Sequence, residues 1–476
     1  MLIGFVFFYM LVSIAIGLYA ARRVHSSSDY VLAGRSLPVY ITIATVFATW
    51  FGSETVLGIP ATFIEEGIGG VVSDPFGAAL CLILVGLIFA GPLYRMKLLT
   101  IGDFYKRTYG RSVELLVSIC ICISYLGWVA AQIMALGLVF NLLTHGGITQ
   151  EWGMVLGLGI VLIYTIFGGM WSVAMTDFMQ MIMIVVGLFI ISFFISNMAG
   201  GVDVVVTAAV DAGKFDNFWP EMTLPGILAF LAAWMTMGFG SIPQQDVFQR
   251  VMSAKSEKAA IGGTVTGGVL YLLFAFIPIY LAYSAFVIQP EIVALQLEQD
   301  SQIILPSLIL EHTPIWVQVM FFGAVLSAIM STASGTLLAP SVTFAENIAR
   351  GFLKNMDDRH FLTLIRGSVV GFAGIVLVIA LNSELSIFEM VENAYKVTLA
   401  GAIVPLFAGI YWKRANTPGA MAAIILGIGT WIIMEFISPE GEGICPPQLA
   451  GFVASCFGMI VGSLVTKQSA RPAEAV

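Results

Sequence analysis

The chain has 476 residues, of which 59% are apolar and only 11% are charged, and its mean hydropathy is +0.95. Soluble domains carry about 25% charged residues, so this composition fits no set of soluble domains and predicts an all-α polytopic membrane protein. The net charge is −8, and no stripe of Lys and Arg is interleaved with aromatic residues, which argues against a nucleic-acid partner.

Apolar runs of about 18 residues or more predict thirteen transmembrane helices. The first run has no basic segment before it and is followed by Arg22 and Arg23, which indicates a retained helix rather than a cleaved signal peptide. The runs begin near residues 2, 40, 72, 115, 152, 174, 224, 260, 315, 361, 387, 418 and 447.

Basic residues are concentrated in every second loop between these runs. The loops after odd-numbered spans and the C-terminal tail hold nineteen of the 21 Lys and Arg, including Arg250 and the tail residues Lys467 and Arg471. The opposite side holds Lys214, and Lys396 lies within the eleventh span. Because basic loops remain cytoplasmic, we expect an inner (plasma) membrane protein with its N-terminus outside and its C-terminus in the cytoplasm.

The number of spans suggests an inverted repeat within a single transporter domain, residues 1–476. If the first span is accessory, spans two to six and seven to eleven form two sets of five, and the odd number turns the second set upside down. The chain then divides into an accessory helix and loop, two repeats, and two C-terminal helices with a tail: residues 1–36, 37–200, 220–412 and 413–476.

The first helix of each predicted repeat is broken by small residues and Pro. The breaks contain Gly52, Ser53, Gly58 and Pro60 in one helix, and Gly238, Gly240, Ser241 and Pro243 in the other. Paired broken helices indicate a binding site at the membrane midplane of a secondary transporter. The alternative is that Gly and Pro are simply common in membrane helices.

Several function classes are excluded by what the sequence lacks. The longest loops are too short for a nucleotide-binding module, and the sequence contains no Walker A motif. The four histidines are scattered in loops, and no nucleophile lies beside a base at motif spacing, so we expect no enzyme. An ion-coupled carrier, a channel, and a sensor that needs a partner chain remain.

A neutral oxygen cluster in the ninth span suits sodium. Ala328, Ser331 and Thr332 follow helical spacing, which places one carbonyl and two hydroxyls on a single face. Carbonyls freed from a broken helix can complete such a site. The alternative is that the Ser and Thr mediate helix packing.

Two ionisable residues lie deep within spans: Glu54 in the first break and Lys396 in the eleventh span. Charges at this depth are functional candidates and normally have partners. Glu54 and Lys396 either pair with each other, which we favour, or separately bind the two ends of a zwitterionic substrate. Asp177 lies nearer a span end, where an acid is also compatible with a purely interfacial role.

Other polar and aromatic residues at a similar predicted depth are candidates for substrate contact. Aromatic faces attract cations, although each Trp is also compatible with helix packing or an interfacial belt. Amides inside a bundle need partners and are plausible substrate hydrogen-bonders. The candidates are Trp50, Trp128 and Trp234 among the aromatic residues, and Gln132, Gln244 and Gln245 among the amides.

With these residues in view, the sequence resembles the sodium:solute symporter family, which contains proline, glucose, sialic acid and choline carriers. Segments 29–38 and 100–110 are similar to the family's first two cytoplasmic segments, and residues 164–172 and 409–420 resemble its two signatures. The resemblance extends over nearly all the predicted spans. It implies a LeuT-type fold, with alternating access driven by a sodium gradient.

The resemblance also implies roles for individual residues. Ala48 and Phe51 would give carbonyls to the main sodium, together with the cluster of Ala328, Ser331 and Thr332. Asp177 matches an acid that serves a second sodium in some members, with two serines on span nine. Those two positions hold Ser334 and Gly335 here, so one of the hydroxyls is missing.

The resemblance divides over the substrate. Residues 241–250 are similar to the choline carriers, and Trp50 fits their aromatic cage, but Gln244 stands where they have Trp. Residues 58–60 resemble the proline carriers, although Glu54 replaces an apolar residue and Trp50 an acid.

We therefore predict a Na⁺-coupled symporter for a small organic solute. An amino acid such as proline is placed first, a quaternary ammonium compound such as choline second, and organic acids and sugars after them. The expected partners are sodium, the solute and membrane lipid, without an obligate protein partner; the rival interpretation is a sensor or channel. The expected substrate residues are Trp50, Gly52, Ser53, Glu54, Trp128, Gln132, Gln244, Gln245 and Lys396.

Overall fold

The computed structural model describes residues 1–353, 356–438 and 443–466, and in this part the chain is helical without a β-strand. The predicted tail residues Lys467 and Arg471 lie outside the described residues. Nine helical segments of the described chain are long and apolar enough to cross a membrane. They are α1 (Leu2–Ala21), Val72–Met96, which contains α5 (Ala78–Leu84) and α6 (Ala90–Met96), α8 (Arg111–Leu143), α9 (Gln150–Met198), α13 (Glu257–Ile288), Ile315–Gly351, which contains α16 (Ile315–Thr343), α17 (Asp358–Asn382), α20 (Thr417–Ile437) and α21 (Pro447–Val465).

Three further segments are pairs of shorter helices, each bent by more than 40° at a short break. The first two are the helices that the sequence predicts to be broken, and the third was not predicted. The pairs are α3 (Val39–Trp50) with Glu54–Gly69, which contains α4 (Ile59–Glu66), at 56°, α11 (Leu224–Gly240) with α12 (Gln245–Ser253) at 47°, and α18 (Ile387–Gly401) with α19 (Ile403–Tyr411) at 45°.

Short helices connect these segments outside the predicted spans. Two of them, like α18, begin with a capping box, in which a Ser or Thr side chain and an acid three residues later satisfy the first free N–H groups. The connecting helices are α2 (Ser27–Leu32), α7 (Ile101–Tyr109), α10 (Val202–Asp211), α14 (Pro290–Gln299) and α15 (Ile304–His312).

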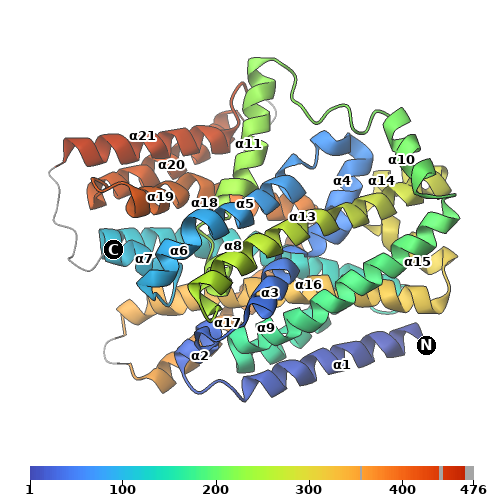
Figure 1. The fold of residues 1–476 in the computed structure, drawn as a ribbon, viewed down its shortest axis with the longest axis horizontal. Coiled ribbons are helices and arrows are strands. Elements are labelled where there is room, and N and C mark those ends of the chain that lie inside the picture. The colour runs from blue at the N-terminus through green and yellow to red at the C-terminus, as the bar shows by residue number, and fades with distance from the viewer. Residues whose placement is uncertain (354–355, 439–442, 467–476) are drawn as a thin grey trace.

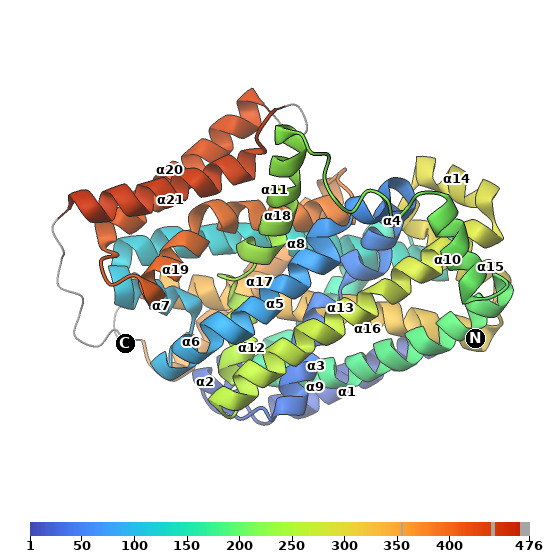
Figure 2. The same ribbon diagram turned by 45° about the horizontal axis from the view of Figure 1, so that its top comes forward.

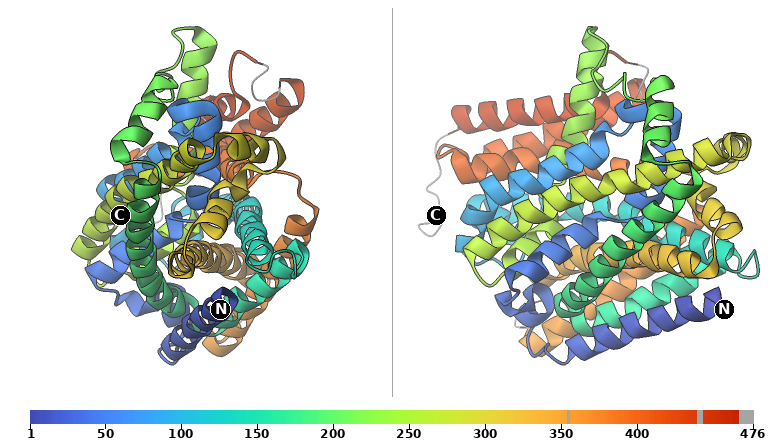
Figure 3. Two further views of the ribbon diagram at one scale, coloured as in Figure 1. Left: turned by 90° about the vertical axis from the view of Figure 1, so that its right-hand side faces the viewer. Right: turned by 45° about the vertical axis from the view of Figure 1, so that its right-hand side comes forward.

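The long helices run side by side, with α1 along one edge and the α20–α21 pair along the opposite edge (Figure 1). The view turned about the horizontal axis shows α20 and α21 lying together on the outside of the bundle (Figure 2). From the end of the bundle, several long helices are seen nearly along their axes (Figure 3, left). Helix α16 lies deepest, since every side chain from Phe321 to Thr343 is buried.

Helix α9 is 49 residues long and contains a break at Gly169, where φ is 49° and ψ is −136°. A straight helix of this length would extend about 74 Å, more than twice the hydrocarbon thickness of a bilayer. A Cβ on Gly169 would lie 2.3 Å from the carbonyl oxygen of Tyr30, so both the backbone angle and the close approach require Gly. By length and composition the described chain has nine to twelve spans, and the predicted count of thirteen stays a prediction.

We expect Gly169→Ala to lower the stability of the protein by about 1–3 kcal/mol, because the substitution forces a left-handed backbone onto a residue with a Cβ. The matched control is Gly159→Ala in the same helix, where a Cβ meets no atom within 4 Å. Thermal unfolding of the purified full chain in detergent should show a lower melting temperature for the first variant only. Equal melting temperatures would contradict this account of the break.

Candidate functional site

The break between α3 and Glu54 lies at the centre of the bundle. Phe51 leaves the helical conformation, with φ of −88° and ψ of 69°, and the chain resumes as a wide π-type turn over Glu54–Gly58. Every residue of this turn is buried. Wide turns of this kind free backbone groups and often occur at functional sites.

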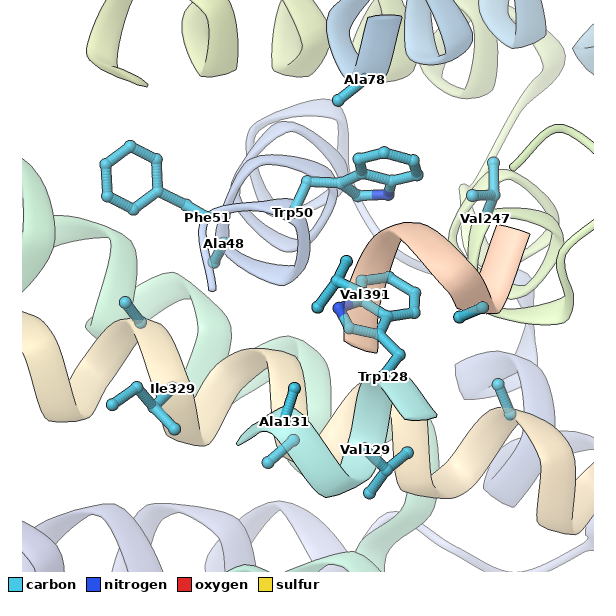
Figure 4. Close-up of a cluster of buried hydrophobic side chains, with 14 of the residues drawn as sticks. Ala48, Trp50, Phe51, Ala78, Trp128, Val129, Ala131, Val247, Ile329 and Val391 are labelled. Carbon is cyan, nitrogen blue, oxygen red and sulfur yellow. The ribbon is translucent and has the colours of Figure 1, made fainter. Parts of the chain in front are cut away.

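The residues predicted to bind the main sodium are brought together at this break. Ala48 and Phe51 on α3 and Ala328, Ser331 and Thr332 on α16 are all fully buried. The Thr332 hydroxyl donates a hydrogen bond of 2.8 Å to the carbonyl of Thr49, which joins α16 directly to the end of α3. Figure 4 shows Ala48, Trp50 and Phe51 on one side of this junction and Ile329 of α16 on the other.

The predicted acid of the second sodium site belongs to the same cluster. The carboxylate of Asp177 on α9 accepts a 2.6 Å hydrogen bond from the Ser331 hydroxyl and another from Thr45. Ser334 donates instead to the carbonyl of Ser331 in its own helix. The two predicted sodium sites are therefore contiguous, and Ser331 lies between them.

Arg250 was assigned to a cytoplasmic loop by the sequence, and this assignment is wrong. Arg250 lies on α12, is 1% exposed, and has its Nη2 atom 4.0 Å from an oxygen of Asp177. Its guanidinium also donates to the carbonyls of Thr45 and Asp246, at 3.1 and 2.9 Å. Helix α12 follows the second break and is buried along its length, so Arg250 lies in the core of the protein.

Gly335 makes room for this guanidinium. A Cβ at position 335 would lie 2.2 Å from Nη2 of Arg250. Where the family has its second serine, this chain has Gly335, and the guanidinium of Arg250 fills the space beside Asp177. The replacement of Ser by Gly was visible in the sequence, but nothing in the sequence indicated which side chain fills the space.

Glu54 lies on the other face of the α3 break, together with three of the predicted substrate residues. One carboxyl oxygen accepts hydrogen bonds from Gln132 at 2.8 Å and Ser53 at 3.5 Å, and the other accepts from Trp128 at 3.3 Å. The backbone N–H of Ser53 donates to the Gln132 side chain at 3.0 Å. Helix α8 thereby satisfies both the acid and the freed backbone of the break.

Gly52 connects the two faces of the break. A Cβ at this position would lie 2.5 Å from a carboxyl oxygen of Glu54 and 2.7 Å from the hydroxyl of Thr332. Only a Gly allows both side chains to approach the backbone this closely. The predicted substrate and sodium residues are therefore separated by a single residue without a side chain.

A cluster of aromatic rings adjoins the Glu54 carboxyl through Trp128, whose indole nitrogen donates to it. The ring of Trp50 lies 5.9 Å from that of Trp128, 6.1 Å from that of Tyr395 and 6.4 Å from that of Tyr271, measured between ring centroids. Trp128 also stacks on Tyr125 at 6.0 Å. We call these five residues the aromatic cage. The sequence identified its two Trp and missed its three Tyr, because Tyr is common in membrane helices and no pattern marked them.

Two polar atoms of the aromatic cage are buried without a hydrogen-bond partner among the described residues. They are the indole nitrogen of Trp50 and the hydroxyl of Tyr395. Buried donors in a folded protein are normally satisfied, so such atoms point to a ligand with an acceptor oxygen.

A second acid reaches the aromatic cage from the start of the third predicted span. Asp74 is buried and accepts a hydrogen bond from the hydroxyl of Tyr271, whose oxygen lies 3.2 Å from the Thr55 hydroxyl. Asp74 is not among the residues predicted from the sequence, although an acid flanked by apolar runs is a signal that could have identified it.

Gln244, Gln245, Trp234 and Lys396 are the remaining predicted residues. The Gln244 amide bonds to Ser124 and Thr398, and Gln245 accepts from the backbone N–H of Ile101. The ring of Trp234 packs against Phe76 and Phe230 rather than in the cage. Lys396 is buried beside Tyr395 on α18, and its pairing with Glu54 stays a prediction.

A cavity of about 440 Å³ adjoins the break, because Gly58 of the wide turn belongs to its lining. Four glutamates also line it: Glu65, Glu66, Glu389 and Glu392. Its acidic lining would raise the local concentration of cations near the break.

Comparisons with known proteins agree with this architecture. The model of the sodium:solute symporter family matches residues 30–427. The human high affinity choline transporter 1 is 26% identical over 449 residues, covering 90% of this chain and 75% of that protein. The high-affinity proline transporter PutP of Bacillus subtilis (strain 168) is 27% identical over 494 residues, covering 97% of both.

Solved structures show the same fold. A substrate-bound, outward-open Na⁺-coupled sialic acid symporter has a TM-score of 0.84 at 21% identity, covering 98% of this chain and 99% of that one. Mhp1, a nucleobase-cation-symport-1 family transporter, in a closed conformation has a TM-score of 0.63 at 15% identity, covering 95% and 98%. These are LeuT-type transporters, so the predicted fold class is confirmed apart from the number of spans.

We expect Gly52→Ala to abolish most transport while the protein still folds, because the new methyl group displaces both Glu54 and Thr332. The matched control is Gly262→Ala on α13, where a Cβ meets no atom within 4 Å. Uptake of the accepted solute into proteoliposomes, with size-exclusion profiles of both variants, provides the measurement. Full activity of Gly52→Ala would show that the close approach is unimportant.

Proposed function

Because the chain belongs to the sodium:solute symporter family, we propose that it couples the uptake of a small organic cation with an acceptor oxygen to the inward movement of sodium. The observation that carries this proposal is the buried carboxyl of Glu54 within the aromatic cage. The chain is an integral membrane transporter, and we propose the inner membrane with the N-terminus outside.

The aromatic cage supports a cationic substrate. Ring faces attract ammonium groups, by about 2 kcal/mol or more when the site is desolvated. The carboxyls of Glu54 and Asp74, each hydrogen-bonded to a ring of the cage, would supply negative charge in their ionised forms. The free donors of Trp50 and Tyr395 would bind an oxygen of the substrate.

These features favour a choline-like compound over the amino acid that the sequence placed first. The substrate carboxylate of proline would lie near two acids, and this repulsion opposes binding unless Lys396 compensates it. Sugars would leave the negative charges without a partner, and organic acids would be repelled. The similarity to both choline and proline transporters is compatible with either of the first two classes.

We further propose that sodium binds between α3 and α16. The carbonyls of Ala48, Phe51 and Ala328 and the hydroxyls of Ser331 and Thr332 would be its ligands, as oxygen atoms suit a hard monovalent cation. The C-terminal end of α3 also carries the negative end of its helix dipole, which favours a cation there. In the present structure the hydroxyls of Thr332 and Ser331 donate to Thr49 and Asp177, which leaves lone pairs on both oxygens to coordinate the ion.

A single sodium ion per transport cycle is supported by Arg250. Its guanidinium already provides a positive charge near Asp177, and Gly335 removes a hydroxyl from the second predicted site. A second cation beside Asp177 would meet repulsion from this buried charge. The second sodium site at Asp177 and Ser334 is therefore not part of the proposal.

Sodium binding and substrate binding are coupled because the two faces of the α3 break, one with Thr332 and one with Glu54, are contiguous. Sodium bound at Ser331 and Thr332 would fix the end of α3, and Gly52 transmits that position to Glu54 across a single residue. Sodium would thus favour the state in which the aromatic cage is complete, and the substrate would favour sodium binding by the same amount. We also propose that residues 37–200 and 220–412 form the inverted repeat, each beginning with a broken helix.

We expect choline to raise the melting temperature of the purified protein in sodium but not in potassium. A ligand at about 100 times its Kd stabilises by about 2.7 kcal/mol. Glu54→Gln should raise the choline concentration needed for this shift by about ten-fold or more, because the substitution removes the charge that faces the ammonium group. Glu291→Gln, on an exposed helix, is the matched control.

The same screen includes proline, glucose and an organic acid. A sodium-dependent shift with proline and none with choline would overturn the substrate proposal while leaving the sodium proposal intact. A conductance far above carrier turnover, without saturable uptake, would instead support the channel interpretation.

We expect solute uptake to depend hyperbolically on sodium concentration, because the proposal has one sodium ion per cycle. The double variant Ser331→Ala with Thr332→Ala should lose this sodium dependence. The control double variant is Ser341→Ala with Thr343→Ala, since both hydroxyls bond only to carbonyls of the same helix. Radiolabelled uptake at varied sodium provides the measurement. Unchanged sodium dependence in the Ser331 and Thr332 double variant would contradict the sodium site. A sigmoidal dependence of wild-type uptake on sodium would contradict the proposal of one sodium ion per cycle.

A further inference from the structure

Two neighbouring cavities lie away from the aromatic cage. Residues 84–89, the end of α11, α19 and α21 line one of them, and α6, α7 and α19 line the other. Figure 2 shows α6, α7 and α19 near the same end of the bundle. The first cavity has a volume of about 540 Å³ and an entirely apolar lining, which includes the rings of Phe89, Phe239, Phe407 and Phe452.

The second cavity, of about 650 Å³, contains positive charge. Arg95 at the end of α6 and Arg107 on α7 line it together with the hydroxyl-bearing Thr108 and Tyr411, and none of its lining residues is an acid. The guanidinium of Arg95 lies 3.7 Å from the carboxylate of Glu257, and that of Arg107 donates a 3.3 Å hydrogen bond to the carbonyl of Met96. Arg95 is 65% exposed, so its contact with Glu257 leaves the guanidinium accessible.

The two cavities share two walls. On one side, Ile88 and Phe89 line the apolar cavity and Arg95 lines the basic one, about 10 Å further along the helix. On the other side, Phe407 and Ala408 line the first cavity, and the next residues of α19 line the second. The walls are joined by the Phe89–Phe407 contact, with ring centroids 6.3 Å apart.

The position of both cavities fits the cytoplasmic edge of the membrane. Arg95 and Arg107 belong to the loop region with five basic residues, which the positive-inside rule places in the cytoplasm. Tyr411 and Trp412 lie between the apolar and the basic cavity, as aromatic residues do at a membrane interface. Phe407 is 51% exposed, so the apolar cavity opens on the surface that faces lipid.

We propose that the two cavities together hold one anionic phospholipid of the cytoplasmic leaflet. An acyl chain would occupy the apolar cavity, and the phosphate of the headgroup would bind the guanidinium groups of Arg95 and Arg107. Basic pockets between helices on the cytoplasmic side are suited to anionic headgroups, and Arg binds phosphate in a bidentate manner. A sterol would leave the arginines unused, and free phosphate would leave the apolar cavity unused.

The proposal is independent of the transported solute. It is tested on the purified full chain, delipidated in detergent and mixed with dioleoyl phosphatidylglycerol or dioleoyl phosphatidylcholine, by native mass spectrometry. We expect phosphatidylglycerol to be retained preferentially as a single adduct. Arg95→Gln with Arg107→Gln should weaken its binding roughly ten-fold or more while leaving the phosphatidylcholine signal unchanged.

Matched controls separate this site from general surface charge. Arg22→Gln with Arg359→Gln removes the same charge from exposed residues of the same predicted face. Val404→Trp fills the apolar cavity and should weaken binding of the same adduct, whereas Ile425→Trp, which is 59% exposed on α20, should not.

Equal loss of the adduct in both arginine double variants would overturn the proposal, as would equal retention of the two lipids by the wild type. Retention of inorganic phosphate at the same affinity as phosphatidylglycerol would also overturn it. Each variant is also checked for a monodisperse size-exclusion profile and for the solute-induced shift in melting temperature. Unchanged results show that folding and solute binding are intact.

Discussion

The structure depends on how polar groups are satisfied where α3 is broken inside a membrane protein. A broken helix exposes backbone groups that no lipid can hydrogen-bond, so the protein must supply partners. The Thr332 hydroxyl bonds to the carbonyl of Thr49, and the Gln132 side chain bonds to the N–H of Ser53. These two partners come from α16 and α8, which fixes both helices around the break. The same contacts bring hydroxyl oxygens and the Glu54 carboxyl to the break, where we propose that the ion and the solute bind.

Buried acids in this core each have a defined partner, and the partner determines what each acid can do. Asp177 faces Arg250, which occupies space left by Gly335 and reduces the need for a second external cation. Asp246 is held by the hydroxyl of Tyr125. The Glu54 carboxyl accepts hydrogen bonds from Trp128, Gln132 and Ser53, and these three donors are neutral. A cationic substrate would supply the charge that these donors do not.

The third bent segment connects the transport site to the lipid-facing side. Helix α18 carries Tyr395 of the aromatic cage, and α19, beyond the bend, forms a wall of both peripheral cavities. At the bend, the hydroxyl of Tyr105 donates to the carbonyl of Ala402 at 2.9 Å. Helix α7 therefore satisfies the backbone of this break, as α8 and α16 do for α3. One bent segment thus contacts both the aromatic cage and the proposed lipid site.

The sequence by itself determined the helical membrane class and the two broken helices, because hydrophobic length and the positions of Gly and Pro are local properties. The family followed from short motifs, such as residues 164–172 and 409–420, that resemble its signatures. The sequence also identified Glu54, Trp128, Gln132, Ser331 and Thr332, which the structure brings to one junction. Only the tertiary structure decided which residues meet there. Arg250, Asp74 and Tyr271 reach the core from distant segments. Gln244 bonds to Ser124 and Gln245 to the backbone of Ile101, and Trp234 packs against Phe76. These outcomes depend on helix rotation and on contacts between residues far apart in the chain, which no local pattern in a single sequence records.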